Sequence, residues 1–486
     1  MNSNHIKSTS ISSQERKKIF SDSKTLFLRS IVVKINGLIS NTFLSFYLGP
    51  EKLGILKLID VIPAFGKYIN LGYDSYILRN VNKVRTKEGI QNNELYKTSR
   101  AGSLIFSSLI LLLVLPIFYF IHPKEYYLLI TIANIAAIAF IFVRNFSNNV
   151  QLIEDFRYIG FWEIISSFFQ IAIILCSVWF IGLYAPLIAI LCSYLILIYA
   201  MYKRSDIPLK FSFDKKSHKR QLKLSLPLAI GTLLFGLELV IERYTVSFFL
   251  SNEILGNYFL VLLVYGGFGT LLNNILRASS VKIYQKSSSL REAREIFPFL
   301  IETSLSLAFI ILITSAGIIE IINYLFYDFF GEYGLFLEAN HVIVLVAVIS
   351  TSQLYFVHSL TSSGLNRQLI VIIARLSSIL FFVSILYLNQ NINFINLIYL
   401  KSYTIALFGF ISFLAYFWTL KIKFQSMIFS ILLLLVPILL SLNYSIFYYD
   451  PLIKISVIFI TLFISTLWFK NKNRVSAYFY KHEKTI

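Results

Sequence analysis

Charged side chains lie within several apolar stretches of this sequence that are long enough to span a lipid bilayer. A charge at the centre of a bilayer costs about 2.5–3.5 kcal/mol on insertion scales, so such residues pair with one another or face a cavity. The clearest set is Lys57, Asp60, Lys67 and Asp74, whose spacings of three, seven and seven place them on one stripe of an α-helix. This stripe predicts either internal ion pairs or the wall of a cavity, and we favour the cavity.

Deep polar residues also occur in three other predicted spans, two of them in the second half of the chain. Lys34 and Asn41 are seven residues apart and share one helix face, and Glu238 and Glu242 share another. Arg243 follows directly and is placed to pair with a neighbour in the other half. The candidate cavity residues outside the second span are Lys34, Asn36, Asn41, Glu238, Glu242, Arg243, Asn273, Asn274 and Arg277.

The basic members of this set indicate the class of substrate. Lysine and arginine form charge-assisted hydrogen bonds to phosphate oxygens, so a cationic cavity suits an anionic substrate, whereas a cation exporter needs an acidic one. The acids Asp60, Asp74, Glu238 and Glu242 either couple transport to a proton or sodium gradient or only balance the neighbouring cations. The predicted substrate-binding cations are Lys34, Lys57, Lys67, Arg243 and Arg277, and Asn36, Asn41, Asn273 and Asn274 are the predicted polar lining.

The remaining charged residues have a simpler interpretation. Arg144, Arg375 and Lys454 are close enough to span ends for their side chains to reach the membrane surface, and Lys401 lies near the outer end of its span. The sequence has no nucleotide-binding loop, catalytic triad or metal-ligand spacing. We therefore expect a transporter rather than an enzyme, with no metal or cofactor apart from a coupling H⁺ or Na⁺.

Long apolar stretches must position these residues. Hydrophobic residues make up 57% of the 486 positions and charged residues only 14%, a balance that is not that of a soluble protein. The sequence predicts an all-α polytopic membrane protein with about fourteen transmembrane helices. The predicted spans lie near 25–48, 54–78, 101–121, 128–147, 160–181, 186–202, 225–250, 257–279, 298–319, 341–363, 369–388, 397–420, 426–446 and 452–469.

Lysine and arginine are divided unevenly between the connections of these spans. The two tails and the connections on their side hold nearly all of them, whereas the opposite connections hold only Lys52 and Lys124. Cationic loops remain in the cytoplasm during insertion, so both termini are predicted to be cytoplasmic. The net charge of +19 then belongs to loops that face anionic lipid headgroups, and not to a nucleic-acid-binding surface.

One nine-residue pattern, F-[FY]-L-x-x-E-x-L-G, occurs at 46–54 and again at 248–256. The copies follow the first and the seventh predicted spans, so they share one orientation and indicate two parallel six-helix lobes around a central cavity. Two further helices follow the second lobe. The predicted organisation is an N-tail (1–24), an N-lobe (25–202), a cationic linker (203–224), a C-lobe (225–421), two extra spans (422–469) and a C-tail (470–486).

Three short motifs carry a family resemblance. Tyr47-Leu48-Gly49-Pro50-Glu51-Lys52-Leu53-Gly54 lies between the first two spans, Leu226-Pro227 opens the seventh, and Glu242-Arg243 stands where the family often has Asp-Arg. With the span count and the repeat, these motifs make the chain similar to the polysaccharide-unit flippases. These are the Wzx-type O-antigen translocases of the multidrug/oligosaccharidyl-lipid/polysaccharide (MOP) exporter superfamily, whose fold is MATE-like.

The resemblance implies a flippase of the bacterial inner membrane. Its substrate would be an undecaprenyl-diphosphate-linked oligosaccharide for O-antigen, lipopolysaccharide or capsule synthesis, moved to the outer leaflet by alternating access. A polysaccharide polymerase and a chain-length regulator are the implied partners. Two alternatives stay open, a lipid-linked peptidoglycan-precursor flippase and, disfavoured by the cationic cavity, a cation-coupled multidrug antiporter. A glycan polymerase or ligase would need a long outer loop, and the predicted outer connections are short.

Overall fold

The computed structural model is helical over nearly all the residues that it describes. These residues are 13–66, 69, 73, 77, 90–153, 155–205, 210–212, 214–266, 290–325, 333–362, 368–421, 424–446, 448, 450 and 455–468. Nine helices within them are long and apolar enough to cross a membrane, and residues 430–446 and 455–468 form shorter apolar helices. Each of the fourteen predicted spans contains helix in its described part, which confirms the all-α fold.

The first half of the chain forms one group of packed helices, here called the N-terminal group. Helix α7 packs on both α1 and α8, and α8 packs on α6. Short 3₁₀ segments precede α5 and α6 (Ile90–Asn92 and Lys124–Tyr126). The helices of this group are α1 (Ser13–Ile59), α2 (Val61–Phe65), α5 (Glu94–Ile121), α6 (Tyr127–Leu152), α7 (Phe156–Ile181) and α8 (Tyr184–Ser205).

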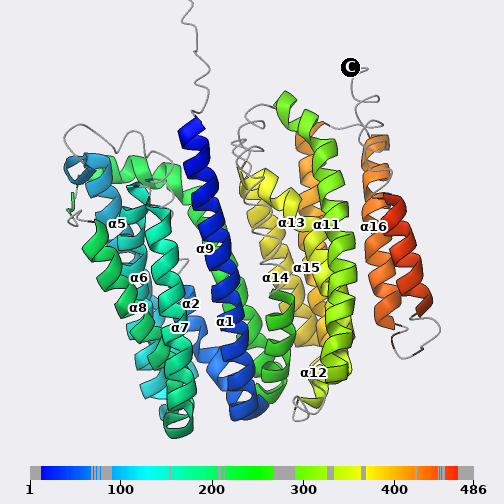
Figure 1. Cartoon of the computed structure of the whole chain (residues 1–486), viewed down its shortest axis with the longest axis horizontal. Coiled ribbons are helices and arrows are strands. Elements are labelled where there is room, and N and C mark those ends of the chain that lie inside the picture. Colours follow the sequence, from blue (N-terminus) through cyan, green and yellow to red (C-terminus); the bar gives the residue numbers. More distant parts are fainter. Residues whose placement is uncertain are drawn as a thin grey trace, which may run out of the picture.

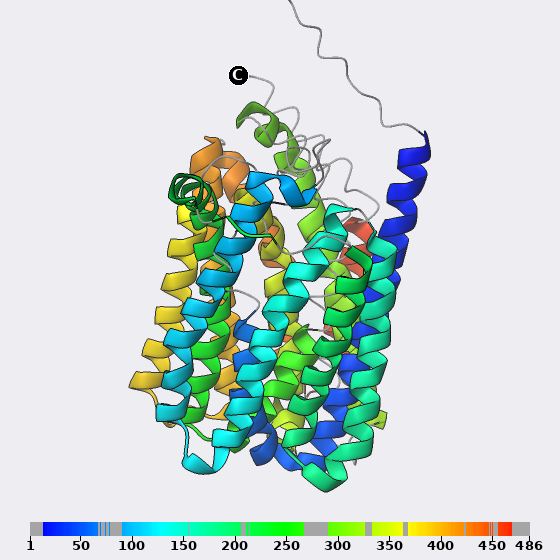
Figure 2. The same cartoon turned by 90° about the vertical axis from the view of Figure 1, so that its left-hand side faces the viewer.

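The second half forms the C-terminal group. Helix α13 packs between α11 and α15, and α14 packs between α9 and α15. Figure 1 shows the two groups side by side, with α16 (Phe424–Ile446) and residues 455–468 beyond α11 at one edge, and Figure 2 views the N-terminal group face on. The helices of this group are α9 (Lys215–Phe249), 252–266, α11 (Leu290–Leu325), α12 (Gly334–Ala339), the 3₁₀ turn η3 (Asn340–Val342), α13 (Ile343–Ser362), α14 (Gln368–Leu388) and α15 (Phe394–Leu420).

The outward-facing side chains are those of a protein surrounded by lipid. Phe120, Phe180 and Trp418 are 89%, 87% and 86% exposed, respectively, and long apolar side chains like these cover the outside of both groups. A surface of this kind is stable in hydrocarbon and is an aggregation hazard in water. Helix α1 begins and residues 455–468 end at the same end of the bundle (Figure 1), as an even number of crossings requires.

Polar residues in the connections begin several of these helices. The Asn93 side chain accepts hydrogen bonds from the amides of Leu95 and Tyr96 at the start of α5. Main-chain N–H groups donate hydrogen bonds in the same way to the side chains of Asp155, Asp214 and Asn393 at the starts of α7, α9 and α15. Each side chain satisfies an N–H group that lacks a partner within the helix, so the chain re-enters the apolar layer with fewer unpaired groups.

The first and second predicted spans contain a bend and a break. Helix α1 bends at Gly49, where φ is 70°, and its last turns already belong to the second predicted span. The helix then breaks at Asp60, and the short α2 ends at Phe65. Pro63 explains this break, because proline has no N–H group and its ring clashes with the carbonyl of Ile59 four residues earlier. The predicted stripe is therefore not carried by one continuous helix.

Candidate functional site

A cavity of about 1190 Å³ is lined by helices of both groups. The N-terminal group contributes residues of α1, α2, α7 and α8, and the C-terminal group contributes α9, residues 259–266, α11, α13, α14 and α15. Its charged and polar lining residues are Lys34, Asn36, Ser40, Asn41, Lys57, Asp60, Ser167, Gln170, Glu238, Glu242, Arg243, Ser350, Arg375, Lys401 and Thr404.

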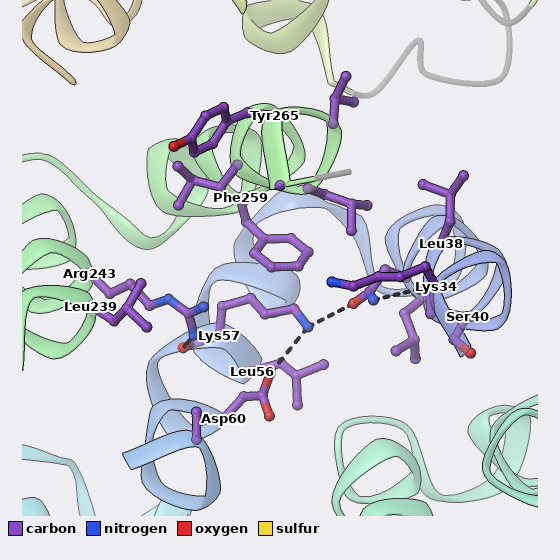
Figure 3. Close-up of a pocket in the computed structure, with 18 of the residues that line it drawn as sticks. Lys34, Leu38, Ser40, Leu56, Lys57, Asp60, Leu239, Arg243, Phe259 and Tyr265 are labelled. Atoms are coloured by element: carbon purple, nitrogen blue, oxygen red, sulfur yellow. Dashed lines mark hydrogen bonds and ion pairs between the residues drawn. The ribbon is translucent and has the colours of Figure 1, made fainter. Parts of the chain in front are cut away.

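Lys57 is held at the junction of the two groups. Its ammonium nitrogen donates to the side-chain oxygen of Asn41 at 2.9 Å and lies 3.4 Å from the Asp60 carboxylate. It also lies 4.1 Å from the centre of the Phe259 ring, which belongs to the C-terminal group. Figure 3 shows Lys34 and Lys57 extending toward one another inside the cavity. The N-terminal wall therefore presents two neighbouring ammonium groups, one of which is paired with Asp60.

Arg243 reaches Lys57 from the opposite group (Figure 3). One terminal nitrogen of the guanidinium donates to the main-chain carbonyl oxygen of Lys57 at 2.8 Å. This carbonyl is one of the last four of α1, and such carbonyls lack a partner within their helix. The break at Asp60 thus supplies the acceptor, and the expected contact of Arg243 with the other half of the chain is present.

The carboxylates of α9 are paired within the C-terminal group. The Lys401 ammonium lies 2.5 Å from Glu242 and 3.9 Å from Glu238. The Arg375 guanidinium forms an ion pair with Glu238, and the Tyr258 hydroxyl donates to Glu242. The side chains of Lys401 and Glu242 are only 9% and 5% exposed, so most of their surface is covered by neighbouring side chains.

One sequence prediction is wrong at this network, and another is incomplete. The Arg375 side chain was expected at the membrane surface, but it is only 13% exposed and lies against Glu238 and the Phe408 ring. Lys401 lies near the start of α15, as expected, but its side chain is buried beside the same acids, which the sequence did not indicate. The sequence did contain a sign that these acids need partners from another helix, because Glu238 and Glu242 are two acids beside the single cation Arg243. A second cation was therefore required from another helix, and the spans that supply it begin more than 100 residues later.

The cavity brings together most of the predicted site residues. Among the lining residues that the structure describes, five cations face three carboxylates, a formal net charge of +2. The predicted site residues that line it are Lys34, Asn41, Lys57, Asp60, Glu238, Glu242 and Arg243. Asn36 also lines it, but its amide donates to Ser167 of α7 at 2.8 Å and so joins two helices. The predicted residues Lys67, Asp74, Asn273, Asn274, Arg277 and Lys454 lie outside the described residues.

Uncharged residues complete the lining. Gln170, Ser350 and Thr404 line the cavity without a signal in the sequence, because polar uncharged residues are common within spans and these have no distinctive spacing. Phe259, Tyr265 and Phe408 add aromatic rings to the C-terminal wall. Over the described part of the chain, no three His, Cys, Asp or Glu side chains are grouped as a metal site requires.

Comparisons with known proteins agree with this architecture. The model of a family described as "Polysaccharide biosynthesis protein" matches residues 26–266, which include Lys34, Lys57, Glu238, Glu242 and Arg243. No curated protein sequence matches the chain.

Several solved transporter structures have the same fold. An inward-facing MATE family multidrug resistance transporter of the MOP superfamily has 15% identity, with 82% of this chain and 94% of that chain covered, at a TM-score of 0.57. The lipid II flippase MurJ in an inward closed conformation has 17% identity, with 93% and 99% covered, at 0.56. A MOP superfamily transporter from Pyrococcus furiosus has 14% identity, with 83% and 97% covered, at 0.52. The chain is a multi-pass membrane protein with the fold of the MOP superfamily transporters.

Proposed function

We propose that this protein flips a lipid-linked oligosaccharide from the inner to the outer leaflet of the bacterial cytoplasmic membrane. The substrate would be an undecaprenyl-diphosphate-linked repeat unit of a surface polysaccharide. The observation that carries the proposal is the cavity between the two helix groups, whose described lining has a formal net charge of +2. The match of the N-terminal half to a polysaccharide biosynthesis family supports the glycan part of the substrate.

The arrangement of charge supports a diphosphate as the bound group. Glu238 and Glu242 are paired with Arg375 and Lys401, and Asp60 is paired with Lys57. Lys34 and Arg243 also line the cavity and approach Lys57 from two sides, so three cations lie close together there (Figure 3). A diphosphate between them would accept charge-assisted hydrogen bonds from ammonium and guanidinium groups of both helix groups. The predicted cations Lys67 and Arg277 would extend the same site.

The uncharged lining supports a sugar beside the phosphates. Gln170, Ser350 and Thr404 offer hydrogen-bonding groups of the kind that sugar hydroxyls use, and Tyr265 and Phe408 offer ring faces. The prenyl chain would remain in the lipid beside the helices. In this proposal the two groups alternate about the cavity, so that it opens first to one leaflet and then to the other. Both termini would be cytoplasmic, and a polymerase and a chain-length regulator would act on the flipped product.

The acids of the cavity are proposed to balance charge. Each described acid of the cavity lies beside a cation, and the Glu242 carboxylate also accepts from Tyr258. A carboxylate engaged in this way is poorly placed to receive Na⁺ as well. This arrangement also argues against a multidrug antiporter for cations, because the cavity would repel a cationic drug.

A second candidate is a flippase of the lipid-linked peptidoglycan precursor. The similarity to the MurJ fold, which covers 93% of this chain, favours this alternative. Both substrates would present a lipid diphosphate to the same cations, so the cavity charge does not distinguish them.

Deletion of the gene in its host distinguishes the candidates. Viable cells that lack surface polysaccharide and retain the lipid-linked oligosaccharide on the inner leaflet are expected. Lysis with accumulated peptidoglycan precursor would support the second candidate instead. Unchanged glycan with altered drug sensitivity would overturn both in favour of an antiporter.

A further inference from the structure

The two copies of the nine-residue pattern lie against each other in the folded protein. A side-chain Cβ at Gly54 would lie 2.7 Å from the carbonyl carbon and 3.2 Å from the Cα of Asn252. A Cβ at Gly256 would lie 2.7 Å from the carbonyl carbon and 3.0 Å from the Cα of Pro50. Real Cβ atoms do not approach main-chain atoms this closely. Both positions therefore require glycine for main-chain contact between the two groups.

The contact is reciprocal. Gly54 and Gly256 occupy the last position of the pattern in each copy, and Pro50 and Asn252 occupy the fifth. Each copy thus places its last residue against the fifth residue of the other, as equivalent residues do across a two-fold axis. We call these four residues the glycine clasp. It lies where α1 bends at Gly49, at the end of the bundle opposite to the start of α1 (Figure 1).

Other contacts between the groups surround the glycine clasp. The Tyr333 hydroxyl donates to the carbonyl oxygen of Ser45 at 2.7 Å, and the His122 ring lies 2.7 Å from the Tyr244 hydroxyl. These contacts join the ends of the two groups on the side of the glycine clasp. An open cavity at this end would require all of them to separate.

Arg243 connects the glycine clasp to the cavity. Its hydrogen bond to the carbonyl oxygen of Lys57 crosses between the groups one helical turn from Gly54. Arg243 also lines the cavity, so the same guanidinium faces the proposed substrate. A phosphate is charged and competes strongly with a neutral carbonyl for a guanidinium N–H group.

We propose that the glycine clasp is the gate between the two groups at this end, and that an anion bound in the cavity opens it by drawing Arg243 away from Lys57. The coupling step rests on the proposed function, whereas the gate itself does not. Substrate charge and lobe separation are then linked through one side chain.

Cross-linking across the glycine clasp tests the gate. Glu51 and Glu253 are exposed, flank the glycine clasp and are equivalent positions of the pattern. Glu51→Cys and Glu253→Cys would be combined with Cys176→Ser and Cys192→Ser, which remove the native thiols. A short bifunctional maleimide, added to the purified protein in lipid nanodiscs, should link the pair efficiently, because each position adjoins a residue of the glycine clasp.

Alanine substitutions then separate the gate from general damage. Gly54→Ala and Gly256→Ala are each expected to lower the cross-linking yield to about half or less. The added methyl group would push the two main chains apart and make the open and closed populations comparable. Gly317→Ala in α11 is the matched control, because a Cβ there meets nothing within 4 Å. Unchanged cross-linking in both clasp variants would overturn the gate. If those variants do not fold, Tyr333→Phe serves as the second test, because it removes the hydrogen bond to Ser45 between the groups. A yield equal to that of the parent pair would then overturn the gate.

Inorganic pyrophosphate tests the coupling step. It should lower the cross-linking yield of the parent pair and have no effect when Arg243→Gln is added. Pyrophosphate that binds by calorimetry without changing the yield would overturn the coupling. Pyrophosphate that does not bind at all would contradict the anion site of the proposed function and the coupling with it, while the glycine variants still decide the gate.

Discussion

Removal of the Lys401 ammonium is expected to destabilise the protein strongly. Lys401 lies 2.5 Å from Glu242 and 3.9 Å from Glu238, and its side chain is 9% exposed. In Lys401→Met, Glu238 keeps Arg375, but Glu242 is left with only the hydrogen bond from Tyr258. One buried carboxylate then lacks a countercharge, and removal of one partner of a buried pair costs about 3–5 kcal/mol.

The assay is unfolding of the purified protein in mixed micelles by added SDS, read as the free energy of unfolding. Glu242→Gln combined with Lys401→Met is expected to recover most of the loss, because neither charge then remains alone. Arg204→Met is the control, since Arg204 forms a pair of similar length with Asp155 but is 52% exposed. That surface pair should contribute about 0–1 kcal/mol. A loss for Lys401→Met no larger than that of the control, or no recovery in the double variant, would refute this reasoning.

Three further predictions follow from particular contacts. Arg243→Ala is expected to leave the protein in the membrane but abolish surface glycan display, whereas Lys124→Ala on a connection should not; normal display in the Arg243 variant would contradict the cationic site. Asn93→Ala should cost about 0.5–2 kcal/mol by removing the cap of α5, measured as faster amide exchange in its first turn. Hydrogen bonds from Ser217 hold the pKa of Asp214 below its ordinary value of 3.8, so the cap of α9 should persist down to that pH and be lost only below it. Amide exchange at Ser217 across the acid range checks this, and loss of protection well above pH 3.8 would be inconsistent with it.

The sequence predicted much of the site because charges in apolar spans have few places to lie. Lys34, Lys57, Glu238, Glu242 and Arg243 were singled out for this reason, and all line the cavity. The rule uses only the high free energy of a charge in hydrocarbon, so it requires no knowledge of which helices are neighbours. It therefore finds residues but not their partners.

The partners depend on tertiary packing, and there the sequence was insufficient. Arg375 and Lys401 were judged by their distance from span ends, but they are fixed by the packing of α14 and α15 around α9. The break of the second span at Asp60 is a similar case. Proline and glycine in that stretch indicate bending, but only the folded chain shows that Lys57 and its carbonyl lie at the bend beside Arg243.

For the internal repeat, too, the sequence indicated the elements but not their contacts. The pattern at 46–54 and 248–256 correctly indicated two groups of like orientation. It gave no sign that the copies contact each other, because a repeat in sequence does not specify how its copies are placed in space. The reciprocal fit of Gly54 on Asn252 and Gly256 on Pro50 comes from the structure alone.

The most direct test of the central claim is transport by the purified protein in liposomes that contain a lipid-diphosphate-linked oligosaccharide in one leaflet. Appearance of the glycan in the other leaflet would be followed with a membrane-impermeant glycosidase. We expect transfer by the parent protein, little or none by Arg243→Ala, and normal transfer by Gly317→Ala. Equal transfer by the parent and by Arg243→Ala, or none above that of protein-free liposomes, would show that this protein is not a flippase with a cationic binding site.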